Sequence, residues 1–369
     1  MSGTTSAEAG AQASLAAMLS AYDTAQLIGT VDNLMLADTF MLDRFFPDIE
    51  VSETEKVALD VDIGVRRLAP FTAPTSEAKP VESRRFTTNM FTPPYIKDLR
   101  NPDLLKPVRR QYGERLMGGM SPAERLEFNL AYEISDQLDM IKRRMEWMAC
   151  QAMVNSSYVV KGEGYPAVEI DFGRDPSLTF ALSGAAQWGQ TGVSPSASID
   201  AWAAMMLKKS GATPRDLIFT TSPWNAFKAD VGVLNSVLWD PRAGGADLNL
   251  GSQIETGAVF KGHWGQYNCW LFNDWFVDPD TGIEEPMIPD GTVIMTTPQL
   301  QGTQVFGLIV DPEFSYMPMP YAPKMWVEKN PAQVNLLMQS APLVIPSRPN
   351  ASLCATVMAA GADVPAPGI

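Results

Sequence analysis

The longest regular pattern of apolar and polar residues runs from Ser121 to about Asn155 and predicts one continuous amphipathic helix. Apolar residues recur there at helical spacing: Leu126, Leu130, Ile134, Leu138, Ile141, Met145, Met148 and Ala152. Ser121 and Pro122 are typical of a helix start, and Glu124 can complete a capping box. At 1.5 Å per residue such a helix is about 50 Å long. Because this exceeds what a compact core needs, we expect the helix to be the spine of an extended molecule.

In the segment before the spine helix, apolar and polar residues alternate, which is a period of two and is typical of a strand. Residues 57–63 alternate apolar and polar and predict a strand. Seven prolines follow, which exclude a central sheet strand and favour an extended arm or a long two-stranded loop: Pro70, Pro74, Pro80, Pro93, Pro94, Pro102 and Pro107. The segment 53–110 has little core of its own, which is unusual inside a compact domain. We therefore expect it to be stabilised elsewhere, on another subunit.

Short elements of both kinds follow the spine helix. Residues 158–160 and 167–172 flank Gly162-Glu163-Gly164 and predict a hairpin. Residues 183–198 are rich in Gly, Ser, Pro and Gln and predict a boundary. A second unit then contains a helix at 199–210 ended by Gly211, a helix start at 222–224, and strands at 217–220, 267–277, 293–297 and 304–310. The strand-rich stretch 326–344 is expected to return to the spine. Helices and strands do not alternate strictly, so the predicted class is α+β.

Composition narrows the class of protein. The chain has 369 residues, of which 46% are hydrophobic and 19% charged, as in ordinary globular proteins. No apolar run is long enough to span a bilayer, and residues 1–10 lack the basic start of a signal peptide, so we expect a soluble chain without a membrane partner. The three cysteines, Cys150, Cys269 and Cys354, are scattered and odd in number, which favours reduced thiols in a cytoplasm.

Charge is unevenly distributed. The net charge is −14, which disfavours sequence-specific binding of nucleic acid. Between Glu53 and Arg115, however, 12 Lys and Arg residues outnumber 9 Asp and Glu residues. A mildly basic segment on an acidic body suits a subunit whose loop lies across a copy of itself. Chance placement of solvated charges explains the same counts equally well.

A cluster of aromatic residues precedes this basic segment. Phe40, Phe45 and Phe46 lie within seven residues. Such a cluster predicts a hydrophobic anchor, either in the chain's own core or in a neighbouring subunit. Residues 1–20 are rich in Ala, Ser and Gly and predict no stable element, and residues 24–38 have weak helical character.

Catalytic and metal-binding motifs are not found in the sequence. The single histidine, His263, cannot form a His cluster or a Cys/His zinc site, and it fits a loop or packing role. No phosphate-binding, dinucleotide-binding or nucleophile motif is present. Five carboxylates surround one predicted turn: Asp274, Asp278, Asp280, Glu284 and Glu285. Paired carboxylates can hydrolyse glycosides, but a solvated turn explains this cluster more simply, and its order does not match a calcium loop. We therefore predict no catalytic residue, metal ligand or cofactor.

Several short stretches, in this order along the chain, resemble one family: residues 45–47, 54–59, 91–97, 143–148 (RRMEWM), 162–173 (GEGYPAVEIDFG), 289–292 and 339–343. Together they resemble the major capsid (head) proteins of lambda-like tailed bacteriophages, which have the Hong Kong-type phage capsid fold. The resemblance covers roughly residues 38–346. No single stretch is diagnostic, and the specificity comes from their order.

The resemblance implies a division of the chain. Residues 1–52 would be the N-terminal arm and 53–110 the extended loop, or E-loop. Residues 111–194 would form the peripheral domain, with the spine helix 121–155 and the hairpin. Residues 195–320 would form the axial domain at the capsomer centre, and 321–369 would supply C-terminal strands that return to the peripheral domain.

The resemblance also implies a function. Copies of the chain would self-assemble into pentamers and hexamers of an icosahedral head that encloses phage DNA without sequence-specific binding. Further partners would be a decoration or cement protein, a scaffold and a portal, with assembly in the bacterial host cytoplasm and a final place in the virion. Our candidates for inter-subunit contacts are Phe40, Phe45, Phe46, Arg66, Arg67, Arg84 and Arg85. The alternatives are an encapsulin-like nanocompartment shell and a carboxylate-dependent hydrolase.

Overall fold

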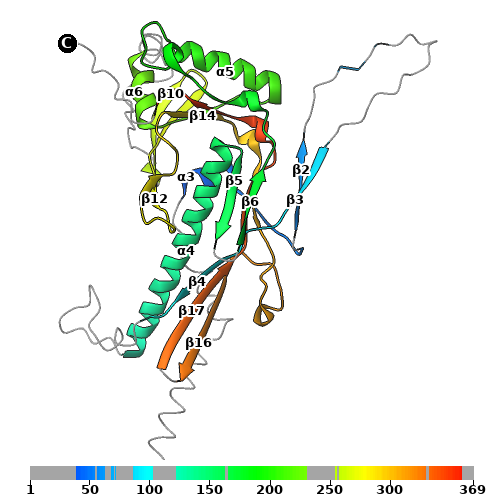
Figure 1. Ribbon diagram of the computed structural model, residues 1–369, viewed down its shortest axis with the longest axis vertical. Helices are drawn as coiled ribbons and strands as arrows, with labels where there is room; N and C mark the ends of the chain where they lie inside the picture. Colours follow the sequence, from blue (N-terminus) through cyan, green and yellow to red (C-terminus); the bar gives the residue numbers. More distant parts are fainter. Residues whose placement is uncertain are drawn as a thin grey trace, which may run out of the picture.

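The computed structural model describes residues 39–54, 56–62, 68–69, 71, 86–102, 122–162, 165–230, 254–255, 257–329 and 332–359. The molecule is elongated, and one long helix, α4, connects a large sheet at one end to a narrow sheet at the other (Figure 1). Helices and strands mix without strict alternation, so the predicted α+β class is confirmed. Among the described residues, no helix combines the length and apolar character needed to cross a membrane.

The spine helix predicted from the apolar period is present. Helix α4 spans Pro122–Val154, 33 residues, within one residue of the predicted bounds at each end. Seven of the side chains that the period selected are buried: Leu130, Ile134, Leu138, Ile141, Met145, Met148 and Ala152. The hairpin predicted after the helix is also present, as strands β5 (Ser157–Gly162) and β6 (Tyr165–Asp171) in antiparallel pairing.

Strands from distant parts of the chain pack beside α4. Strand β17 (Ala332–Ser340) lies between β16 (Ala322–Lys329) and β4 (Ile96–Arg100), and both pairings are antiparallel. A second sheet has the order β1 (Asp48–Val51), β15 (Gly302–Phe306) and β18 (Pro342–Pro346). All five residues of β18 are buried, as expected for a strand packed against the spine helix.

The predicted strand at 57–63 is β2 (Val57–Asp62), which pairs with β3 (Phe86–Phe91) in a two-stranded hairpin. This hairpin projects from the side of the molecule (Figure 1). Strand β4 belongs to the same predicted extended segment, yet it pairs with β17 of its own chain. The segment 53–110 is therefore tied to its own subunit at strand β4.

The largest sheet has seven strands, in the order β7 (Thr179–Ala181), β19 (Ser352–Thr356), β14 (Thr292–Thr296), β8 (Asp216–Phe219), β11 (Tyr267–Phe272), β10 (Ala258–Trp264) and β9 (Ile254–Glu255). Its central strands β8 and β14 are buried along their whole length. Strand β19 pairs with β14 in this sheet and also contacts the spine helix α4.

Two helices accompany the large sheet. Helix α5 spans Pro195–Ser210 and starts earlier than the apolar pattern indicated, because Ser194 caps it and Pro195 occupies its first turn. It ends as predicted at Gly211, whose φ of 76° is left-handed. Helix α6 spans Thr221–Ala229. The predicted strand 267–277 is divided, because β12 (Trp275–Val277) leaves the sheet and pairs with β13 (Glu284–Pro286).

Candidate functional site on the spine helix

The outward face of α4 carries large apolar side chains in solvent. Phe128, Tyr132 and Met140 are 52%, 64% and 55% exposed. The spacing of 128, 132, 136 and 140 is four residues, so these positions follow one side of the helix. Asp136 fills the remaining position of this row. The result is an apolar stripe interrupted by a carboxylate, and we call these four residues the outer stripe.

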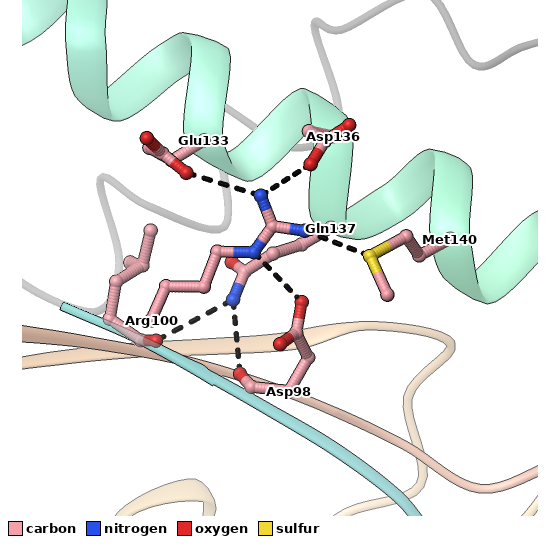
Figure 2. A network of polar contacts seen from close by, with 7 residues as sticks. Asp98, Arg100, Glu133, Asp136, Gln137 and Met140 are labelled. Carbon is pink, nitrogen blue, oxygen red and sulfur yellow. Dashed lines mark hydrogen bonds and ion pairs between the residues drawn. The ribbon is translucent and has the colours of Figure 1, made fainter. Parts of the chain in front are cut away.

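A polar cluster joins the outer stripe to strand β4 (Figure 2). The guanidinium of Arg100 donates from Nε to Asp98 at 3.0 Å, from Nη1 to Glu133 at 3.1 Å, and also from Nη1 to Asp136. Its Nη2 faces the sulfur of Met140 at 2.9 Å. The base of the extended segment is therefore clamped to the middle of the spine helix.

Within the part of the chain that the structure describes, the guanidinium of Arg100 faces three carboxylates. Burial alone would lower the pKa of Arg100, but the hydrogen bonds to Asp136 and Glu133 raise it above its ordinary value. The Asp136 side chain remains 51% exposed, so its second oxygen can still meet a partner. Beneath the cluster, the amide of Gln137 donates to the Asp98 carbonyl at 3.0 Å and secures β4 independently of charge.

The structure places the three predicted phenylalanine anchors inside their own subunit. Phe40 and Phe45 lie in helix α3 (Phe40–Phe45), and Phe46 follows directly; all three side chains are buried. The ring of Phe40 lies 4.9 Å from that of Trp270 and 5.7 Å from that of Phe272, centroid to centroid. All three rings therefore belong to the core of their own chain, which is one of the two positions that the sequence allowed. The other predicted candidates, Arg66, Arg67, Arg84 and Arg85, lie outside the described residues.

The predicted carboxylate turn is the hairpin β12–β13, which packs beside α4. Several of its carboxylates are engaged with basic residues: Asp274 pairs with Arg143 at 2.8 Å, and Asp280 pairs with Lys161 at 3.1 Å. A groove of about 720 Å³ separates this hairpin from α4 and β5. Across the described ranges, no group of three or more His, Cys, Asp or Glu side chains could hold a metal ion.

The remaining candidate residues have packing roles. His263 lies in β10, where its exposed ring packs 5.0 Å from that of Phe260. Cys150, Cys269 and Cys354 are free and buried. Burial raises the pKa of Cys269 to about 12 and that of Cys354 to about 11, and it also raises the pKa of Cys150 well above its ordinary value. These thiols are therefore protonated and poorly nucleophilic at neutral pH.

The sequence did not single out the Arg100 cluster. Arg100 is one of many basic residues in the segment 53–110, and Glu133 and Asp136 look like ordinary solvated positions of an amphipathic helix. The available signal was weak: two carboxylates three residues apart on one side of a helix, and two apolar residues, Phe128 and Tyr132, on its otherwise polar face. Their convergence depends on the pairing of β4 with β17, which has no sequence signature.

The arrangement of a long helix, a hairpin after it, narrow sheets beside it and a separate larger sheet matches solved capsid structures. A prophage protein of Escherichia coli CFT073 that is described as a capsid protein superposes with a TM-score of 0.71 and 18% identity, over 91% of this chain and 99% of its own. The capsid of Ralstonia phage GP4 superposes with a TM-score of 0.50 and 11% identity, over 91% and 94%. The chain has the Hong Kong-type phage capsid fold.

Sequence comparison identifies the family. The family model described as phage major capsid protein E matches residues 23–357. The major capsid proteins of Escherichia phages N15 and lambda are each 26% identical to this chain, over 90% of it and 98% of their own length. The chain belongs to the phage major capsid protein E family and forms the head shell of a tailed phage. The resemblance to lambda-like capsid proteins is confirmed, and these relatives are structural proteins.

Proposed function

We propose that many copies of this chain assemble into pentamers and hexamers that close an icosahedral head around phage DNA. The observation that carries this proposal is the outer stripe of α4, where Phe128, Tyr132 and Met140 remain exposed beside the acidic Arg100 cluster. Large apolar side chains that stay exposed beside charged groups are typical of an interaction surface. A second copy of the chain is the partner that a closed shell requires.

The division of labour within the subunit is part of this proposal. Residues 1–52 act as the N-terminal arm, 53–110 as the extended loop, 111–194 as the peripheral domain and 195–320 as the axial domain. The segment 321–369 contributes strands to both the peripheral and the axial domain. Strands β16, β17 and β18 support the peripheral domain, and β19 completes the axial sheet, which is supported by its pairing with β14.

Charge would guide the contact between copies. Arg66, Arg67, Arg84 and Arg85 of the basic extended segment are proposed to meet carboxylates of a neighbouring subunit. We propose the Arg100 cluster as the acidic partner of these arginines, because the Asp136 carboxylate in it remains half exposed. One exposed ion pair contributes about 0–1 kcal/mol, and salt screens it. In a shell the total contribution of such pairs to the free energy of assembly is larger, because every copy repeats them.

Reversal of the four arginines to glutamate tests this contact. We expect the R66E/R67E/R84E/R85E variant to fold but to lose shells, as judged by size-exclusion chromatography and negative-stain electron microscopy, because repulsion replaces attraction. A matched variant reverses Lys208, Lys209, Lys228 and Lys261, which are exposed and lie outside the segment, and should still assemble. Equal assembly and equal salt response of both variants would refute the charge contact.

Imaging also tests the class of shell. A phage head is expected to be large and to join a tail through a portal, whereas an encapsulin-like nanocompartment is small and holds protein cargo. Membership of the phage capsid family favours the head. We propose assembly in the host cytoplasm with a scaffold, and a decoration protein on the outer surface. The net charge of −14 supports a lumen that repels packaged DNA and does not bind it in a sequence-specific way.

A further inference from the structure

Helix α3 is held on one side by a buried carboxylate of the spine helix. Glu146 of α4 accepts the backbone N–H of Met41 on Oε1 and the backbone N–H of Leu42 on Oε2, both at 2.8 Å. These N–H groups belong to the first turn of α3, where a helix has no internal acceptors for them. The Glu146 side chain is only 2% exposed, so it is enclosed by the segment that it binds.

The other side of α3 is held by the large sheet. Arg44 donates from Nη2 to Oδ1 of Asp216 at 2.7 Å, and its guanidinium lies 4.5 Å from the ring centroid of Trp270. Asp216 is a buried residue of β8, and Trp270 belongs to β11. Six residues of α3 therefore connect the spine helix with two central strands of the seven-stranded sheet.

We propose that α3 is a pH-sensitive bolt, that is, a link between the spine helix and the seven-stranded sheet that can detach. We also propose that Glu146 sets the equilibrium between the closed arrangement, with α3 in place, and the open one, with α3 detached. A helix of six residues has too few internal hydrogen bonds to persist alone. Its place therefore depends on its contacts with α4 and the sheet. Opening exposes Glu146 to water, which gives this carboxylate different surroundings in the closed and open arrangements.

The groups around Glu146 determine the direction of the effect. Burial raises the pKa of Glu146 from 4.5 to about 7, although the hydrogen bonds from Met41 and Leu42 oppose the rise. Asp274, in the turn after β11, and Asp43 of α3 add further repulsion. On α4 itself, Cys150 is protonated and Arg143 is engaged with Asp274.

A carboxyl whose pKa is raised in the closed arrangement favours that arrangement when it is protonated. This contribution is complete below the ordinary value of 4.5, and it is lost as the pH rises through about 7. A higher pH therefore shifts α3 toward the open arrangement, and a lower pH shifts it toward the closed arrangement. With these two values, the opening equilibrium rises about tenfold between pH 6 and pH 8.

Hydrogen exchange of the full-length chain tests the proposal. The first measurement compares peptides covering 39–46 with peptides covering β14, in the wild-type protein at both pH values. After correction for intrinsic exchange rates, the exchange rate of 39–46 relative to that of β14 should rise about tenfold from pH 6 to pH 8. The reason is that ionisation of Glu146 favours the opening of α3 and leaves β14 in place. If β14 exchanges faster by the same factor, the opening is global and the proposal is overturned.

Variants identify the titrating group. In the Glu146→Gln protein the side chain cannot ionise, so the exchange of 39–46 should lose its extra dependence on pH. The matched Glu50→Gln variant removes an exposed carboxylate of β1 and should keep it. The Arg44→Gln variant should speed exchange of α3 by one constant factor at both pH values. A pH dependence that persists in Glu146→Gln, or is lost in Glu50→Gln, overturns the role of Glu146.

Discussion

The burial of Phe40 gives a direct test of where the N-terminal aromatic cluster belongs. Its ring is fully buried against Phe45, Trp270 and Phe272 of the same chain. Replacement of a buried Phe by Ala costs about 3–5 kcal/mol, because apolar contacts are lost and a cavity remains. Aromatic pairs contribute about 0.5–1.5 kcal/mol beyond the buried area, which places Phe40→Ala near about 4 kcal/mol.

The assay is urea unfolding of the unassembled subunit, followed by tryptophan fluorescence because Trp270 contacts the mutated position. With an m-value of about 3 kcal/mol/M, a loss of about 4 kcal/mol lowers the midpoint by about 1.3 M. Phe128→Ala is the matched control. Its ring is half exposed on the outer stripe, so the subunit midpoint should change by less than about 0.3 M while assembly weakens.

Two results would refute this reasoning. An unchanged subunit midpoint for Phe40→Ala, combined with loss of assembly, would place the ring in a contact between copies. A large drop in the midpoint for Phe128→Ala would show that the outer stripe supports the subunit itself and is not free for a partner.

Two further substitutions probe the packing at the end of α3 and the C-terminus of the spine helix. Gly302→Ala should cost at least about 1–3 kcal/mol, because a Cβ at this position would overlap the Phe45 carbonyl and the Phe46 ring; a wild-type urea midpoint would contradict this close approach. Arg174 is buried and donates to the carbonyls of Met153 and Val154 at 2.7 and 2.5 Å, which closes the C-terminus of α4. Arg174→Met should lower the free energy of unfolding by about 2–4 kcal/mol, since each unsatisfied carbonyl costs about 1–3 kcal/mol. Arg348→Met, which removes a donor to the single carbonyl of Ser210, should cost less in the same urea titration.

Local elements were predictable because their signals are local. The apolar period gave α4 to within one residue at each end, and Gly162-Glu163-Gly164 indicated the β5–β6 hairpin. The start of α5 was placed late, since Ser194 and Pro195 lie in a stretch whose composition suggested a boundary. Capping residues outside the apolar period therefore extended the helix.

The candidate site was less predictable. The charge balance between Glu53 and Arg115 fitted a loop lying across an acidic neighbour and chance placement equally well, and it did not identify Asp98, Glu133 or Asp136 as a cluster. Arg100 reaches these carboxylates only because β4 pairs with β17, more than 200 residues later in the chain. The aromatic cluster illustrates the same limit, since its sequence allowed either the chain's own core or a neighbour.

The sequence by itself determined the class of the protein, the spine helix, the hairpin after it and the order of short elements that marks the capsid family. The helix and the hairpin depend on apolar period and turn chemistry, which operate over a few neighbouring residues, whereas the family is marked by the order of short stretches along the chain. Only the tertiary structure decided that Phe40 packs on Trp270, that Glu146 caps α3, and that β19 pairs with β14. Each of these contacts joins residues that are distant in the sequence, and the free energy that selects them comes from burying both partners together.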